Sequence, residues 1–369
     1  MLALVDALIL NGFRSGVENS VLELLRALTE LAPADVTFAA RPSLLTSEPW
    51  LADRHAILAP SFVPGRLGRI LAEQFWLPSA AREAKVLHGP AYVLPLCWRG
   101  RSVVTIYDLI ALRHPEWTKR LNALHYRFLV PRSAARADAI LVPSQAVADD
   151  VSTLPGVSSE KIVVAPLGVR DLCRPRPTSA EVDCFRADHD LRRPFFAVVG
   201  NIEPKKNLRA VLRAFEIASP RLDHDLVLVG RPGWRCAEDL AALRTTPVAG
   251  RVRLLGRLPD ADLRALYAAS TALLQWSLYE GFGLVPLEAM ACGTPVIVSD
   301  GGALAEVAGP AAEVVPLGDP AALAEAMVAL AGDDDRRRAM GKRGLEWSAG
   351  FTWAAHATRA LDLYRTLAQ

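Results

Sequence analysis

Short apolar runs alternate with amphipathic helical stretches along almost the whole chain. The runs consist mainly of Val, Ile, Leu and Ala without polar alternation, which predicts strands buried on both faces of a parallel sheet. Strands are expected at residues 2–10, 36–40, 85–88, 102–107, 139–143, 162–165, 195–200, 225–230, 252–255, 272–275 and 295–299. Because helical stretches separate these strands, the pattern predicts a doubly wound α/β fold.

One stretch interrupts the alternation and divides the chain into two halves of similar size. Residues 170–194 contain Pro175, Pro177 and Pro194 with many charges and few apolar side chains, which is typical of a linker. Each half is long enough for one Rossmann-like sheet. We expect two such parallel-sheet domains facing across a cleft, with a first domain at 1–172, a linker at 173–194 and a second domain at 195–353. The last helix, at about 354–369, could pack back on the first domain.

Composition excludes several classes of protein. With 51% hydrophobic and 22% charged residues, the 369-residue chain is not intrinsically disordered. Its 42 basic and 40 acidic residues give a net charge of +2, which argues against a nucleic-acid-binding protein. No apolar run approaches the roughly 18 residues of a membrane-spanning helix. Five scattered cysteines fit a reducing cytosol, so we expect a cytoplasmic protein.

The arginines of the N-terminal half have two possible interpretations. They could face lipid phosphates, which would place the protein at the inner face of a membrane, or they could simply be solvated. The residues concerned are Arg66, Arg69, Arg82, Arg113, Arg120, Arg127 and Arg132.

The segment between the predicted strands at 272–275 and 295–299 carries the strongest chemical signal. Gly281 and Gly283 allow a tight turn, and Pro286 suits the first turn of the helix that follows. Unpaired N–H groups and the positive end of the helix dipole make such a turn a site for a phosphate or diphosphate.

Two glutamates flank this turn. Glu280 precedes it and Glu288 lies in the helix, where a carboxylate would repel phosphate but accept hydrogen bonds from ribose and sugar hydroxyls. An anion site beside hydroxyl partners indicates a nucleotide-sugar. Taken alone, Glu288 could instead be a charge that complements the helix dipole.

The whole segment closely resembles the donor-site motif of family 4 glycosyltransferases, retaining enzymes of the GT-B fold with a Glu-x7-Glu motif. The matching strings are Glu-Gly-Phe-Gly at 280–283 and Leu-Glu-Ala-Met-Ala-Cys-Gly-Thr-Pro-Val-Ile at 287–297. The resemblance implies that Glu280 holds the sugar hydroxyls, that Glu288 holds the ribose, and that the amides of 281–284 stabilise the departing diphosphate. The implied donor-binding residues of the turn are Gly281, Phe282, Gly283, Leu284 and Val285.

A second segment, residues 198–208, follows a predicted strand and opens a helix. The chain has only six lysines against 36 arginines, yet Lys205 and Lys206 stand side by side here, where a compact charge suits a diphosphate. The segment resembles the family's Gly-Thr-Leu-Glu-Pro-Arg-Lys-Asn-Leu, which implies Gly200 as a donor-site glycine and Lys206 as the phosphate lysine. Many members carry an arginine where Asn201 stands. The alternative is an exposed basic helix start.

Two further strand ends resemble the donor domain of the family. One ends at Gly230 and Arg231, and in the other the loop near Leu258 would meet the base through its backbone. Arg231 and Trp234 could equally be a surface and a packing residue.

The N-terminal half matches the family less densely. Residues 15–25 resemble a glycine loop and first helix that lie under the donor phosphates, which implies a role for Gly16. Residues 103–109 resemble the family's Thr-Ile-His-Asp-Leu, but Tyr107 replaces the histidine that reaches the transferred sugar. Asp108 is either a site residue or the cap of the next helix. With Glu280 and Lys206, Tyr107 and Asp108 form the expected catalytic set.

Three Asp-x-Asp spacings, at 188–190, 223–225 and 260–262, could suggest a metal-dependent enzyme. They lie in the linker, before a strand and at a helix start, so we expect no required metal and no cofactor besides the nucleotide-sugar.

The leading hypothesis is a retaining glycosyltransferase that acts on a glycan or lipid-linked acceptor in polysaccharide or glycoconjugate synthesis. GDP-mannose is the guessed donor. The alternatives are another GT-B nucleotide-sugar enzyme, such as an epimerase, and a nucleotide-sugar-binding protein that Tyr107 has weakened as a catalyst.

Overall fold

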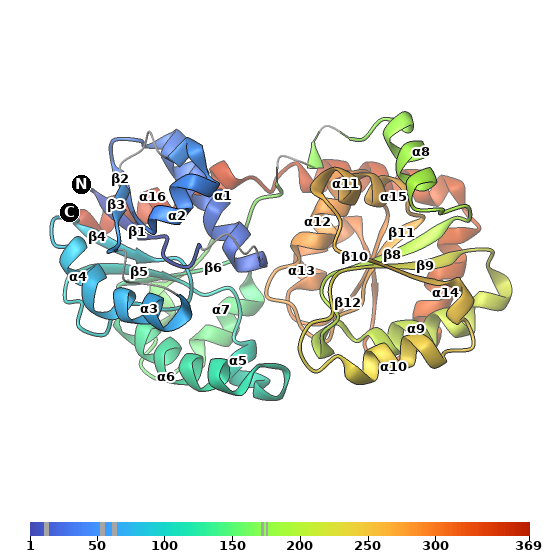
Figure 1. Ribbon diagram of the computed structural model, residues 1–369, viewed down its shortest axis with the longest axis horizontal. Coiled ribbons are helices and arrows are strands. Elements are labelled where there is room, and N and C mark those ends of the chain that lie inside the picture. The colour runs from blue at the N-terminus through green and yellow to red at the C-terminus, as the bar shows by residue number, and fades with distance from the viewer. Residues whose placement is uncertain (11–14, 52–55, 61–64, 171–172, 175) are drawn as a thin grey trace. The chain divides into compact units, whose positions relative to one another are not determined.

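The computed structural model describes the chain except residues 11–14, 52–55, 61–64, 171–172 and 175, and it divides into two compact units. The first unit comprises Met1–Arg113, Arg120–Gly168 and Thr352–Gln369, and the second comprises His114–Lys119 and Val169–Phe351. The α/β class expected from the sequence is confirmed in both units, since each is built on one parallel sheet covered by helices (Figure 1).

The first unit contains a seven-stranded parallel sheet of order β3-β2-β1-β4-β5-β6-β7. Its strands are β1 Ala3–Asp6, β2 Val36–Ala40, β3 Ala56–Leu58, β4 Val86–Gly89, β5 Arg101–Thr105, β6 Ala139–Val142 and β7 Ile162–Val164. Its helices are α1 Gly16–Leu31, α2 Pro42–Ser47, α3 Gly65–Leu71, α4 Leu77–Ala80, α5 Ile110–Arg113, α6 Arg120–Arg136, α7 Gln145–Ser152 and α16 Trp353–Ala368. A π-helical segment at Ala72–Trp76 joins α3 to α4.

The second unit contains a six-stranded parallel sheet of order β10-β9-β8-β11-β12-β13. Its strands are β8 Phe195–Val199, β9 Asp225–Val229, β10 Val252–Gly256, β11 Ala272–Gln275, β12 Val296–Ser299 and β13 Glu313–Val315. Its helices are α8 Ser179–Asp188, α9 Leu208–Ala218, α10 Ala237–Thr245, α11 Asp260–Ala269, α12 Leu284–Ala291, α13 Leu304–Ala308, α14 Pro320–Ala331 and α15 Asp334–Ser348. A single 3-10 turn, Pro204–Lys206, precedes α9.

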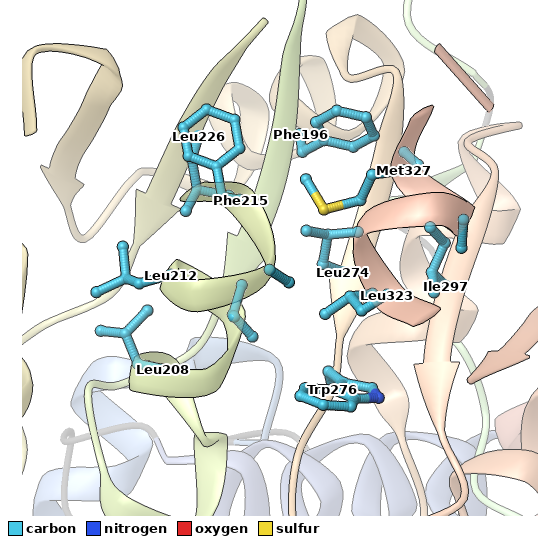
Figure 2. Close-up of a cluster of buried hydrophobic side chains, with 14 of the residues drawn as sticks. Phe196, Leu208, Leu212, Phe215, Leu226, Leu274, Trp276, Ile297, Leu323 and Met327 are labelled. Carbon is cyan, nitrogen blue, oxygen red and sulfur yellow. The ribbon is translucent and has the colours of Figure 1, made fainter. Parts of the chain in front are cut away.

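The core of the second unit lies between its sheet and helices α9 and α14. Figure 2 shows Phe215 of α9 and Met327 of α14 packed against β-strand side chains such as Phe196 and Leu274, all of them fully buried. Trp276, directly after β11, is buried and donates its indole N–H to the Val315 carbonyl at 2.9 Å. This packing fixes the carboxyl ends of β8 and β11.

Several elements differ from the sequence-based expectations. Strands β3 and β13 were not predicted; both are three-residue edge strands, and each has an exposed apolar side chain, Leu58 and Val314 respectively. The first strand ends at Asp6 rather than at residue 10, and the Asp6 carboxylate accepts the Leu8 N–H at 2.9 Å in the turn that follows.

The stretch expected to be a linker belongs to the second unit and contains helix α8. Thr178 and Glu181 form a capping box at the start of this helix. The linker expectation gave more weight to the prolines than to this helix-start signal. Pro175 lies outside the described residues. Helix α16 belongs to the first unit, where it packs against α1 (Figure 1).

Candidate functional site

The clearest cluster of polar side chains in the second unit is formed by Lys205, Lys206 and Glu280. The ammonium nitrogen of Lys205 lies 3.1 Å from Glu280 Oε2, and that of Lys206 lies 2.7 Å from Glu280 Oε1. The side chains are only 20%, 15% and 13% exposed, respectively. One carboxylate is therefore held between two ammonium groups in a largely buried setting.

Glycines at the carboxyl ends of the strands position Lys206. Gly200, directly after β8, has a φ of +138°, and a Cβ there would lie 2.8 Å from Lys206 Cε. Gly230, after β9, has a φ of +150°, and its Cβ would lie 2.0 Å from the Gly200 carbonyl oxygen. Only glycine fits both positions, so the two strand ends and the lysine side chain are packed as one block.

The backbone around Glu280 is fixed from both sides. The Leu278 N–H donates to the Lys205 carbonyl at 2.8 Å, and the Ala303 N–H donates to the Glu280 carbonyl at 2.8 Å. Gly302 has a φ of +63°, and a Cβ there would lie 2.4 Å from the Glu280 carbonyl oxygen. The first of these contacts ties the loop after β11 to the 3-10 turn before α9, and the other two tie it to the loop after β12.

The charges at this cluster keep Glu280 ionised. Burial raises its pKa, but the charges and hydrogen bonds of Lys205 and Lys206 outweigh burial and lower the pKa to about 2. Gln275, at the end of β11, donates its side-chain N–H to Glu280 Oε1 at 3.1 Å and to Ser277 Oγ at 2.9 Å. Glu280 therefore carries a full negative charge throughout the physiological pH range.

Helix α12 begins directly after the glycine turn. Gly283 caps it with a φ of +115°, and Leu284 and Val285 form its first turn, so their backbone N–H groups have no partner within the helix. Phe282 is buried and its ring packs against Phe351 at 6.0 Å between centroids. Gly281 completes the turn between this anchor and Glu280. The turn thus presents backbone amides at a helix N-terminus, as expected from the sequence.

Glu288, one turn inside α12, lies in an ion pair that the sequence did not predict. Its Oε1 accepts from Arg170 Nε at 2.7 Å, and its Oε2 accepts from the Tyr267 hydroxyl at 3.1 Å. Arg170 also lies 3.2 Å from Asp260. Burial lowers the pKa of Arg170, but the charges of Glu288 and Asp260 raise it by more than burial lowers it. The net pKa is above the ordinary value, so the guanidinium stays charged.

Three other predicted donor-binding residues lie around the ends of β8 to β10. Asn201 accepts the Arg231 backbone N–H on its side-chain oxygen at 3.4 Å, and both residues are exposed. Leu258 is buried, with 8% of its surface exposed. Arg231 therefore contributes a backbone contact here, while its guanidinium lies at the surface.

Of the two predicted catalytic residues of the first unit, Tyr107 is buried and Asp108 is partly buried. The Tyr107 ring packs against Tyr92 at 5.7 Å, and its buried hydroxyl has no hydrogen-bond partner. Asp108 accepts the Ile110 N–H at 3.0 Å, as the cap of α5 would, and also accepts from the Tyr92 hydroxyl at 3.1 Å. Gly16 is the first residue of α1, with no atom within 4 Å of where a Cβ would lie.

His88 is a buried structural histidine. Its ring nitrogens lie 2.5 Å from the Tyr364 hydroxyl and 2.8 Å from Thr105 Oγ1. Burial and the nearby His356 lower its pKa to about 3, so the ring is neutral.

A pair of buried carboxylates at the end of β1 escaped sequence reasoning. Glu73 lies in the π-helical segment with its side chain 3.4 Å from Arg69. Burial, and after it the negative charge of the nearby Asp6, raise the pKa of Glu73 to about 8. Burial also raises the pKa of Asp6. Because a π-helix shifts the helical period by one residue, pattern reading places Glu73 on the wrong face.

Two family models cover most of the chain. The model described as Glycosyltransferase Family 4 matches residues 14–171, and that described as Glycosyl transferases group 1 matches residues 181–347. The chain belongs to glycosyltransferase family 4.

The glycosyltransferase is similar to several known proteins. It is 28% identical over 329 residues to O-antigen chain mannosyltransferase B of Escherichia coli, covering 88% of this chain and 82% of the relative. It is 29% identical over 277 residues to the serotype-specific mannosyltransferase WbdA of E. coli, covering 73% of this chain but only 34% of that longer protein. Anabaena Alr3699/HepE in complex with UDP has a TM-score of 0.76 at 17% identity, covering 99% of both chains. The GT-B fold expected from the resemblance is confirmed.

The structure of the glycosyltransferase brings one predicted set of residues together. Lys205 and Lys206 both contact Glu280, Gly200 packs against the Lys206 side chain, and Gly230 packs against Gly200. The ligand-binding roles of these residues stay predictions.

Sequence reasoning missed the residues that hold the predicted site from outside the motifs. They are Gln275, Arg170 and Tyr267. Only Gln275 carried a usable signal, as a polar side chain at the end of an otherwise apolar strand.

None of the helices formed by the described residues is long and apolar enough to span a bilayer. Among the same residues, no three His, Cys, Asp or Glu side chains gather as a metal site requires.

Proposed function

We propose that the glycosyltransferase transfers a sugar with retention of anomeric configuration from a nucleoside-diphosphate sugar to a hydroxyl of a glycan or lipid-linked acceptor. The observation that carries this proposal is the contact of both Lys205 and Lys206 with Glu280 at the carboxyl ends of β8 and β11. In parallel α/β sheets, ligands bind outside the carboxyl ends of the strands, where loops are free to vary.

The two lysines provide the charge that the leaving group requires. When the bond between the anomeric carbon and the diphosphate oxygen breaks, negative charge develops on that oxygen, and ammonium groups fixed beside it stabilise the transition state. Lys205 and Lys206 are held in place by Glu280, so their side chains need to move little when the charge develops on the diphosphate. The amides at the start of α12 add to the same field. We propose that this set of groups makes a metal ion unnecessary.

The carboxylates are proposed to bind hydroxyls. Glu280 stays ionised and accepts hydrogen bonds only, which suits the hydroxyls of the transferred sugar. Glu288 is proposed to accept from the ribose while Arg170 and Tyr267 hold it in orientation. With Glu280 occupied by two lysines, no carboxylate of this cluster is free to act as a nucleophile. We therefore propose that the acceptor hydroxyl attacks from the face the diphosphate leaves, and that the diphosphate takes the hydroxyl proton.

A mannosyl donor and a polysaccharide acceptor are supported by the names of the relatives, which include an O-antigen chain mannosyltransferase. A UDP-sugar is the main rival, because the Anabaena protein of the same fold was solved with UDP. The identity of the base and the identity of the sugar can each be determined by measurement.

Thermal unfolding in the presence of GDP-mannose, UDP-glucose, UDP-galactose and the free diphosphates tests the donor, since a ligand that binds the folded state raises Tm. Lys206→Ala should abolish the shift, whereas Lys342→Ala, at an exposed lysine of α15, should preserve it. NMR of the product formed without acceptor should show slow hydrolysis with retained configuration. Inverted product, or an unchanged shift in Lys206→Ala, would overturn the proposal.

A further inference from the structure

The first unit exposes large apolar side chains on one set of neighbouring helices. Among the described residues, each large hydrophobic residue that is at least 50% exposed belongs to α3, the π-helical segment or α6. They are Leu67 (71%), Leu71 (50%), Phe75 (73%), Leu121 (79%), Leu124 (69%) and Phe128 (50%). Single exposed leucines scattered over a surface are normal, but a contiguous group of exposed apolar side chains marks an interaction surface.

Five of these six side chains, all except Leu67, line a common groove. Leu121, Leu124 and Phe128 have the spacing of one face of α6. Leu71 and Phe75 line the opposite wall, and the groove between the walls has a volume of about 560 Å³. Helices α3 and α6 lie on the same side of the seven-stranded sheet (Figure 1). We refer to the six exposed residues and this groove as the apolar patch.

The charge around the apolar patch is strongly positive. Helices α3 and α6 and the π-helical segment hold six arginines and one glutamate, a net charge of +5, whereas the whole chain has only +2. The glutamate is Glu73, which is buried and lies 3.4 Å from Arg69, so it does not offset the charge at the surface. Arg66, Arg127 and Arg132 are exposed, and the Arg132 guanidinium stacks on the Phe128 ring at 3.7 Å.

We propose that the apolar patch docks the glycosyltransferase on the surface of an anionic phospholipid bilayer. Leucine and phenylalanine side chains enter the boundary between headgroups and acyl chains, while the flanking arginines remain with the lipid phosphates. The combination favours lipid over a protein partner, since the patch exposes no acidic side chain and its apolar tips protrude between arginines. Under this proposal Arg66, Arg127 and Arg132 face lipid phosphates, which is the first of the two interpretations of the N-terminal arginines.

Flotation of the full chain with vesicles tests this proposal without a donor or acceptor, so it can succeed or fail independently of the proposed chemistry. The probes are vesicles of phosphatidylcholine alone and of phosphatidylcholine with phosphatidylglycerol. We expect binding to the anionic vesicles only, and weaker binding as salt is raised.

Two double variants separate the apolar from the charged contribution. Phe75→Ser with Leu124→Ser should weaken vesicle binding by at least about tenfold. The two serines lose the favourable free energy of moving an apolar side chain from water into the bilayer. Arg66→Gln with Arg127→Gln should weaken binding and reduce its salt dependence. All four side chains are exposed, so unfolding temperatures should be unchanged.

A matched control removes exposed leucines elsewhere. Leu31→Ser with Leu254→Ser changes side chains that are 47% and 44% exposed, and it should bind vesicles as the parent does. Equal binding by Phe75→Ser with Leu124→Ser, equal binding to both vesicle types, or no binding by the parent would overturn the proposal. A dimer in sedimentation that Phe75→Ser with Leu124→Ser dissociates would also overturn the proposal, because a second copy of the chain, and not lipid, would then cover the apolar patch.

Discussion

Replacing Glu280 by Gln removes the charge between the two lysines while keeping nearly the same shape. The structure predicts a loss of stability whose size follows from the pKa. In the unfolded chain the carboxyl group has its ordinary value of 4.5, and in the folded protein the two ammonium groups lower it to about 2 despite burial. A difference of about 2.5 units corresponds to about 3 kcal/mol at neutral pH.

The sign of the pH dependence is also determined. A carboxyl group with a lowered pKa in the folded state contributes its full stabilisation above the unfolded value and loses it as the pH falls through the folded value. The parent should therefore be more stable than Glu280→Gln by about 3 kcal/mol at pH 7, and the difference should shrink steadily between about pH 4.5 and pH 2.

Urea unfolding followed by tryptophan fluorescence at pH 7, 5, 4 and 3 measures this difference. The matched control is Glu346→Gln, the same substitution at an exposed carboxylate that lies 4.0 Å from Lys342, and it should change stability by less than about 0.5 kcal/mol. A gap below about 1 kcal/mol at pH 7, or a gap that stays constant down to pH 3, would refute the electrostatic reasoning.

Three further outcomes are expected. Gly200→Ala should weaken donor binding at least about tenfold in thermal-shift titrations, because its Cβ would lie 2.8 Å from Lys206 Cε; Gly250→Ala, with open space around it, is the control. Tyr107→Phe should leave turnover unchanged and stability equal or up to about 1 kcal/mol higher, since the lost hydroxyl is buried without a partner; a large fall in kcat would instead support a catalytic role. In Glu73→Gln, Tm should depend less on pH between 5 and 9, because a carboxyl whose folded pKa is raised to about 8 loses its stabilisation as the pH rises.

The sequence predicted those parts of the structure that depend on local pattern. Buried parallel strands are continuous apolar runs, so the central strands of both sheets were found, and the loops at their ends carried the motif residues. Lys205, Lys206 and Glu280 could be expected to meet because each follows a strand of the same sheet, and strand ends of a parallel sheet gather at one edge.

What the sequence did not predict depends on contacts between distant segments. Arg170 pairs with Glu288 across 118 positions, and no spacing rule connects them. Tyr107 was predicted to be a catalytic residue from its place in a motif, but the motif does not show that its hydroxyl is buried without a hydrogen-bond partner. The apolar patch was missed because amphipathic patterning shows which residues share a helix face, not whether another element covers that face.

The return of α16 to the first unit has a consequence for the order of folding. His88 and Thr105 lie in the first third of the chain, but the Tyr364 hydroxyl that completes their hydrogen bonds is synthesised after the whole second unit. On the ribosome, therefore, the second unit has all of its strands before the first unit has all of its helices. Until α16 is available, His88 lacks its Tyr364 partner and the surface facing α16 stays uncovered, so the native packing of the first unit is completed only after the whole second unit has been synthesised.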